Sequence, residues 1–153
     1  MIDLRELKDI DTLMAWRAEV IRNVFGEEAG SLLLEANRRY YLQHIQDGTH
    51  VAFVASHQSA DCGCGAICFS EELPSPDNPS GKCAYLMNVY VREAYRKHGI
   101  AHKIVLRLIE EAKKQDCGKI YLETTAEGKP VYTSLGFHEM ADMMKYYDSE
   151  NNY

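Results

Sequence analysis

A helix-like segment between two strand-like segments constrains this chain more than any other feature. In residues 100–115 the apolar side chains recur at helical spacing and form one face, made of Ala101, Val105, Leu108, Ile109 and Ala112. Gly118 lies just beyond, where a helix of this kind is expected to stop. Residues 82–91 before the helix and 120–125 after it are rich in residues that favour strands. The region therefore predicts a strand, a helix and a second strand.

The remaining elements complete a mixed order. Ahead of residue 82 the patterns predict a strand at 2–6, a helix from Asp9 or Asp11 to Val24, a helix at 31–46, and strands at 50–56 and 63–69. After residue 125 they predict a short helix at 130–135 and a last strand signal at Phe137 and residues 143–147. The expected order is β-α-α-β-β-β-α-β-α-β, a fold of the α/β (α+β) class whose front half is largely antiparallel.

Length and charge limit the organisation and the partners. The 153 residues show no internal repeat, and the proline-rich stretch 71–81 is expected to join two elements rather than two domains. We therefore expect a single domain over residues 1–153. With 17 basic and 23 acidic residues the net charge is −6, which gives no general attraction to nucleic acid or to an anionic membrane. Neither partner is expected, so any anion site must be local.

The cysteines and the N-terminus indicate a reducing compartment. The five cysteines are an odd number, and only one residue separates Cys62 from Cys64. Structural zinc sites usually have two to four residues between ligands, with a second ligand pair nearby. We expect no metal site and interpret these residues as reduced thiols in or beside a strand, with metal binding as the alternative. The chain begins without an apolar signal core and has no run of about 18 apolar residues, so the cytoplasm is the expected compartment.

The turn before the central helix is the candidate site. It contains Arg96-x-x-Gly99-x-Ala101 between the end of a strand near Val91 and the start of a helix. The first amides of a helix lack partners and carry partial positive charge, which suits a phosphate group. The small residues at 99 and 101 allow close approach to the backbone, and the basic character comes from Arg96, Lys97, His98 and His102. The turn predicts a pyrophosphate site, and the alternative is a tight turn with a charged surface.

Two common phosphate-binding motifs do not fit this turn. A dinucleotide fingerprint needs G-x-G-x-x-G, and a P-loop needs G-x-x-x-x-G-K-[ST]. The turn has neither pattern. Further downstream, the chain contains Tyr132-x-x-x-Gly136-Phe137. With both motifs in this order, the region from about Tyr85 to Tyr147 resembles the GNAT superfamily of acetyl-CoA-dependent N-acetyltransferases.

The resemblance implies a fold, a cosubstrate and a set of contacts. It implies a single-domain GNAT-like fold, with a mixed, mostly antiparallel sheet that has helices on both faces. It implies acetyl-CoA as cosubstrate, with the pyrophosphate on the loop and helix start formed by Arg96, Lys97, His98, Gly99, Ile100, Ala101 and His102. It implies that the strand ending at Val91 splays from the next one and offers backbone contacts at Val89, Tyr90 and Val91. Thr125 stands where many members have asparagine, and it is the expected pantetheine contact there.

The chemistry of acetyl transfer assigns two further roles. An amine must lose a proton, and the departing thiolate needs a proton or another form of stabilisation. Tyr132 is the candidate acid because an ordinary tyrosine is protonated at neutral pH, and the alternative is a core tyrosine packed beside Phe137. Glu123 is the nearest candidate base, with a solvated carboxylate, a water chain or an amine that arrives deprotonated as alternatives. The expected reaction moves an acetyl group from acetyl-CoA to a primary amine of a small molecule or peptide by direct attack in a ternary complex.

Three other questions stay open at this stage. One alternative function is a sensor module that binds acyl-CoA without turnover, and another is an interaction protein whose loop no longer binds CoA. The resemblance implies that the acceptor binds against the first two helices and their loop, where Trp16 is interpreted as core. The methionines and tyrosines of the C-terminal region predict either a core strand or the surface of a homodimer.

Overall fold

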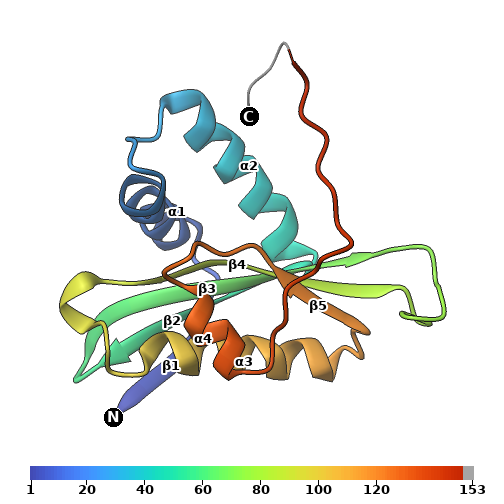
Figure 1. Ribbon diagram of the computed structural model, residues 1–153. Coiled ribbons are helices and arrows are strands. Elements are labelled where there is room, and N and C mark those ends of the chain that lie inside the picture. The colour runs from blue at the N-terminus through green and yellow to red at the C-terminus, as the bar shows by residue number, and fades with distance from the viewer. Residues whose placement is uncertain (150–153) are drawn as a thin grey trace.

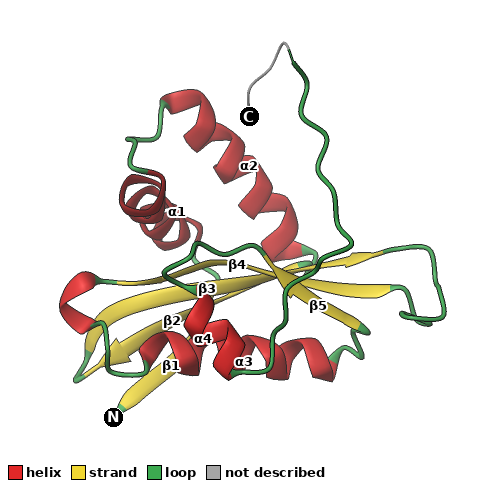
Figure 2. Cartoon of the chain, in the orientation of Figure 1, coloured by secondary structure: helices red, strands yellow, loops and turns green. Residues whose placement is uncertain are grey.

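A five-stranded sheet separates two layers of helices (Figures 1 and 2). The computed structural model describes residues 1–149, and its strands lie side by side in chain order. They are β1 (Ile2–Leu7), β2 (His50–His57), β3 (Ala60–Glu71), β4 (Lys82–Val91) and β5 (Lys119–Leu122). The first four strands pair antiparallel, and β5 pairs parallel with β4. This confirms the expected mixed, mostly antiparallel sheet.

The helices cover both faces of the sheet, as expected. On one side lie α1 (Ile10–Val20), the π-helical turn η1 (Ile21–Phe25) and α2 (Ser31–Gln46). On the other side lie α3 (Ile100–Lys114) and the short α4 (Lys129–Ser134), and the 3₁₀ turn η2 (Glu93–Tyr95) follows β4. Among the described residues, no helix is long and apolar enough to cross a membrane.

Helix α3 packs on the sheet through an apolar face that matches the predicted one in part, because the predicted Ala101 and Ile109 are only half-buried. Its buried residues are Ile100, Ile104, Val105, Leu108 and Ala112. Gly65 lies beneath it on β3, and a Cβ there would lie 2.4 Å from Cγ2 of Ile104. The same strand has Gly63, where a Cβ would lie 2.8 Å from the Tyr90 carbonyl oxygen. Gly63 and Gly65 therefore let helix α3 and strand β4 approach β3 closely.

Strand β4 carries a β-bulge in its second half. Met87 pairs with Ala66 and Tyr90 pairs with Cys64, so two residues of β4 stand opposite the single residue Gly65. One of the two is Asn88, whose φ is +57°. Asparagine tolerates this left-handed conformation better than most residues. The bulge changes the direction of the strand just before its end, as bulges beside functional sites commonly do.

Two predictions for the C-terminal region are wrong, one for the end of β5 and one for a last strand. Strand β5 ends at Leu122, so Glu123 and Thr125 lie in the loop after it rather than in the strand. The predicted final strand at Phe137 and residues 143–147 is absent from the described residues. Met143, Met144, Tyr146 and Tyr147 are instead exposed, since no helix or strand covers them, and a core strand here is excluded. A homodimer remains a prediction.

Candidate active site

The strands β4 and β5 part halfway along β4. Their parallel pairing runs from Cys83 opposite Lys119 to Leu86 opposite Leu122, and β4 continues to Val91. The Arg92 amide donates to the Cys62 carbonyl at 2.8 Å, toward β3. Because alternate residues of a strand direct their peptide groups to opposite edges, Tyr90 also faces β3. Val89 and Val91 therefore present their N–H and C=O groups to the edge that β5 has left.

The loop after β4 brings the start of α3 to the same end of the sheet. Gly99 has a φ of +78° and stands immediately before Ile100, the first residue of the helix. The Lys103 amide donates to the Gly99 carbonyl at 3.1 Å, which leaves the amides of residues 100–102 without intrahelical partners. A Cβ at Gly99 would meet no heavy atom within 4 Å. The first turn is therefore open to an anion, and Ala101 and His102 extend this surface.

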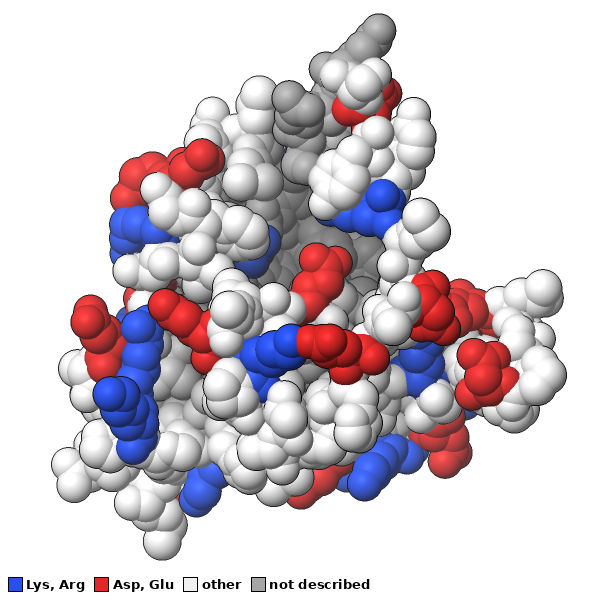
Figure 3. Space-filling model, in the orientation of Figure 1, with Lys and Arg blue, Asp and Glu red and all other residues white. Residues whose placement is uncertain are grey.

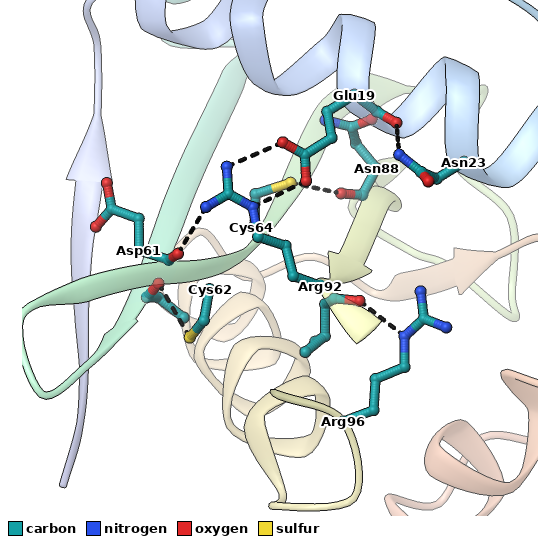
Figure 4. A network of polar contacts seen from close by, with 10 residues as sticks. Glu19, Asn23, Asp61, Cys62, Cys64, Asn88, Arg92 and Arg96 are labelled. Atoms are coloured by element: carbon teal, nitrogen blue, oxygen red, sulfur yellow. Dashed lines mark hydrogen bonds and ion pairs between the residues drawn. The ribbon is translucent and has the colours of Figure 1, made fainter. Parts of the chain in front are cut away.

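The side chains of the loop between β4 and α3, and of the start of α3, have different surroundings. Arg96 donates from Nε to the Val91 carbonyl at 2.9 Å, which ties the loop to the end of β4 (Figure 4). Lys97 and His102 are exposed. His98 lines a cavity of about 490 Å³ that it shares with residues of β1, at the sheet edge opposite β5. The loop thus offers its backbone to a ligand, with Arg96 as the side chain that is fixed in place.

Tyr132 lies on α4, half-buried against the α3 side of the sheet. Its ring meets Phe137 edge-on, with ring centroids 5.8 Å apart. Burial raises the pKa of the Tyr132 hydroxyl above its ordinary value, so the group stays protonated at neutral pH. Thr125 holds the turn before α4, because its hydroxyl accepts from the Gly128 amide at 3.3 Å.

Glu123 lies beside the seam between β4 and β5. The carboxylate is exposed, and it stands one residue beyond the last pair of the two strands. Burial raises the pKa of Tyr85, and the nearby charge of Glu123 raises it further. Tyr132, were it ionised, would raise the pKa of Tyr85 by a smaller amount. The structure thus brings the candidate base and the candidate acid near one tyrosine at the point where the strands part.

A polar network joins α1 to the end of β4, and sequence analysis did not predict it (Figure 4). Arg92 donates to both carboxylate oxygens of Glu19 at 2.9 Å and to the Asp61 carbonyl at 3.0 Å. Its guanidinium lies 4.5 Å from the ring centroid of Trp16, which is buried as predicted. The hydrogen bonds from Arg92 lower the pKa of Glu19. The network therefore fixes α1 above the exit of β4.

A second arginine, Arg17 of α1, reaches the bulge itself. Arg17 donates from Nε to Oδ1 of Asn37 at 3.0 Å and from Nη1 to Oδ1 of Asn88 at 2.8 Å. The ring centroid of Phe25 lies 5.9 Å from its guanidinium carbon. These residues come from four separate elements, so no local motif reveals them; the only signal was the polar Asn88 inside an apolar strand. Figure 3 shows the molecule hollowed between the α1–α2 layer, the sheet and the C-terminal segment.

Cys62 and Cys64 of β3 have separate surroundings. Figure 4 shows Cys62 and Cys64 pointing to opposite sides of the strand. Burial raises the pKa of both thiols, to about 12 for Cys64, which favours the protonated form. Within residues 1–149, no three or more histidine, cysteine or acidic side chains lie together as metal ligands would.

Comparison with known proteins gives one family match and several relatives. Residues 3–137 match the model described as the acetyltransferase (GNAT) family. The chain is 28% identical over 117 residues to N-alpha-acetyltransferase 30 of Saccharomyces cerevisiae, covering 74% of this chain and 65% of the yeast protein. It is 36% identical over 67 residues to a probable glucosamine 6-phosphate N-acetyltransferase of Oryza sativa, covering 44% of this chain and 40% of the rice protein. The matched segments thus span less than two thirds of both relatives.

Solved structures show the same fold along the whole chain. A predicted acetyltransferase from Clostridium acetobutylicum, crystallised with acetyl-CoA, superposes with a TM-score of 0.88 at 26% sequence identity. The alignment covers 100% of both chains.

Proposed function

The chain belongs to the acetyltransferase (GNAT) family, and from this premise we propose that it transfers an acetyl group from acetyl-CoA to a primary amine. The acceptor is a small molecule or a peptide, and it attacks directly within a ternary complex. The observation that carries the proposal is the open edge of β4 beyond Leu86, which stands at the same end of the sheet as the uncapped start of α3.

The residues around this edge suit the donor. A pyrophosphate needs N–H donors and space, and both exist at Gly99, Ile100 and Ala101, where no side chain fills the approach. A pantetheine arm carries amides, which pair with a free strand edge in the same way as another strand does. Val89 and the Val91 amide offer that edge, while the Val91 carbonyl already accepts from Nε of Arg96. The donor therefore lies between β4 and β5, with its phosphates at α3.

The residues at the seam suit the proton transfers. Acetyl-CoA supplies an activated thioester, so a C–N bond forms as the C–S bond breaks, the amine gives up a proton and the sulfur takes one. Tyr132 donates that second proton, since burial keeps its hydroxyl protonated. Glu123 accepts the amine proton, directly or through water, from its exposed place beside Tyr85. A backbone N–H of the open β4 edge polarises the acetyl carbonyl.

The acceptor enters from the α1–α2 side. Figure 3 shows a hollow on that side, and the bulge of β4 adjoins Val89 of the edge assigned to the donor. Relatives and neighbours carry names that differ in acceptor: a protein N-terminus, glucosamine 6-phosphate and an aminoglycoside. These names leave the acceptor of this chain to be argued from its own residues.

Thermal unfolding with acetyl-CoA tests the donor site first. At about 100 times Kd, binding to the native state alone adds about 2.7 kcal/mol to the free energy of unfolding, which is a clear rise in Tm. A panel of amines, followed by thiol release, then tests transfer. A rise in Tm without thiol release from any amine would instead support the sensor alternative, and no rise would contradict the proposal.

A further inference from the structure

We propose that Arg17 binds an anionic group of the acceptor, so that the preferred acceptor is an amine that also carries a carboxylate or a phosphate. This inference rests on the proposed function and specifies its substrate class. It starts from Arg17 of α1, a half-buried cation that makes no ion pair with a carboxylate within residues 1–149.

The position of Arg17 relates it directly to the reaction. Its Nη1 donates to Asn88 at 2.8 Å, and Asn88 stands next to Val89, whose peptide groups form part of the open edge. A group bound to Arg17 therefore lies close to the point where the amine meets the donor. The amine and the anionic group of such an acceptor are separated by only a few bonds.

The partners of Arg17 distinguish it from most arginines of the molecule. Five others form ion pairs with carboxylates, namely Arg5, Arg22, Arg38, Arg92 and Arg107. Arg17 makes no such pair within residues 1–149, and two neutral amide oxygens, from Asn37 and Asn88, hold it instead. Neutral acceptors orient a guanidinium without cancelling its charge. A half-buried cation in this state attracts an anionic ligand strongly, because little solvent screens it.

The guanidinium also has donors to spare. The two amide oxygens engage Nε and one N–H of Nη1, and the side chain has five N–H groups in all. Nη2 makes no hydrogen bond to any residue that the structure describes. The Phe25 ring lies 5.9 Å from the guanidinium carbon and is itself 65% exposed, so it contacts the cation without supplying a counter-charge. Planar, two-pronged recognition of a carboxylate or phosphate is the interaction for which arginine is best suited.

The backbone conformation of Asn88 supports a role for its contact with Arg17 in ligand binding. Its φ of +57° is a conformation that costs free energy outside glycine. The bulge that contains it directs the Asn88 side chain to Arg17. A purely structural arginine would be satisfied more cheaply by a carboxylate, as Arg92 is by Glu19. The arrangement therefore holds a charged, oriented donor rather than a closed ion pair.

Matched pairs of amines test this inference. We would measure thiol release at saturating acetyl-CoA with glycine and glycinamide, β-alanine and β-alaninamide, and 2-aminoethyl phosphate and ethanolamine. In at least one pair, we expect the anionic member to have a kcat/KM about 10-fold or more above that of its neutral partner. The carboxylate and phosphate pairs show which of the two anions the site prefers.

Variants then connect the preference to Arg17. Arg17→Met should bring the ratio within a pair close to one, mainly through KM of the anionic member, while Arg17→Lys should keep part of it. Arg39→Met removes an exposed arginine of α2 and should leave the ratio unchanged. A residue that only supported the bulge would lower both members of a pair together, so the ratio separates the two roles.

Three results would overturn the inference. The first is a higher kcat/KM for the neutral member in every pair that turns over, and the second is an unchanged ratio in Arg17→Met. If no pair is acetylated, the same compounds are added to the protein with CoA, and equal Tm shifts within every pair contradict the inference. Loss of the Tm rise with acetyl-CoA itself would instead contradict the proposed function, so the two failures are distinguishable.

Discussion

For binding the donor, the α3 side of the sheet contributes mainly backbone groups, whereas the α1–α2 side contributes side chains. On the α3 side the parts are the open edge of β4 and the uncapped helix start at Gly99. On the α1–α2 side they are the charged and amide groups of Arg17, Asn88, Glu19 and Arg92. The first set depends on chain geometry and the second on residue identity.

This difference explains why the sequence indicates the donor-binding part of the site more clearly than the acceptor-binding part. A donor that is shared by a whole family needs the same backbone groups in every member, and small residues at a turn reveal them. An acceptor is selected by side chains, which change without altering the fold. The family match therefore supports the proposed donor side, and the individual contacts of Arg17 carry the proposal for the acceptor side. The following four predictions test this division, from the largest expected effect to the smallest.

Gly99→Val should abolish donor binding. A β-branched residue at φ +78° strains the turn, and its side chain occupies the open space in front of the first helical amides. Losing two hydrogen bonds to a charged phosphate is worth about 4 kcal/mol, so Kd for acetyl-CoA should rise about 1000-fold. Isothermal titration measures it. Gly48→Val is the matched control, with a φ of +79° and equally open surroundings; it should lose similar stability and keep donor binding.

Tyr132→Phe should separate chemistry from binding. Removal of a general acid lowers kcat by about 100-fold, whereas Kd for acetyl-CoA should hardly change because the ring and its contact with Phe137 remain. Single-turnover rates and titration give the two values. Tyr121→Phe removes a hydroxyl from β5 outside the proposed chemistry and serves as control. An unchanged kcat in Tyr132→Phe would assign the tyrosine to packing alone.

Mild acid should weaken the α1–α2 side first. His50 is buried beneath α2, accepts or donates a hydrogen bond with Tyr40 at 2.8 Å, and has its pKa lowered by burial from 6.5 to about 4. The unfolded chain therefore takes up a proton below pH 6.5 that the folded protein resists. From pH 7 to pH 5 this lowers the free energy of unfolding by about 2 kcal/mol.

Urea unfolding at the two pH values measures the slope for His50. The variant His50→Gln should flatten the slope, and His102→Gln, an exposed substitution on α3, should not. Donor binding depends on backbone amides, so we expect Kd for acetyl-CoA to change little over the same range. A slope that survives in His50→Gln would place the acid sensitivity elsewhere.

Glu123→Gln should have the smallest effect. The carboxylate is exposed, and water partly replaces it, so kcat/KM should fall only about 10-fold. The loss should shrink at alkaline pH, where the amine arrives deprotonated. Glu127→Gln, another exposed residue of the same loop, is the control. Equal rates for both variants at all pH values would favour a water chain as the acceptor of the proton.

Much of the fold follows from local patterns. The predicted bounds of α2 and β4 agree with the structure, and α3 ends one residue earlier than expected. Each of these elements has a periodic apolar face or a clear stop. The predicted strand at 143–147 failed because its apolar residues had no neighbouring strand to pair with, and period alone does not supply one.

One part of the candidate site was predictable from the sequence, and another part was not. The loop at Gly99 was recognisable because a turn before a helix has a local signature. The network of Arg17, Asn37 and Asn88 was not, because its members are distant in sequence and meet only through packing. The bulge at Asn88 has no sequence signal beyond an amide within an apolar strand.

The parallel pairing of β4 with β5 also bears on the order in which the molecule assembles. Strands β2, β3 and β4 are successive antiparallel neighbours, whereas β5 reaches β4 only after the whole of α3. Contacts between distant segments form later than local ones, so β5 and α4 should dock last and detach first. The proposed donor site lies between β4, which is expected to form early, and β5, which is expected to dock late. A bound donor would contact both β4 and β5 and so oppose the detachment of β5. The amides of β5 should therefore exchange hydrogen more slowly in its presence.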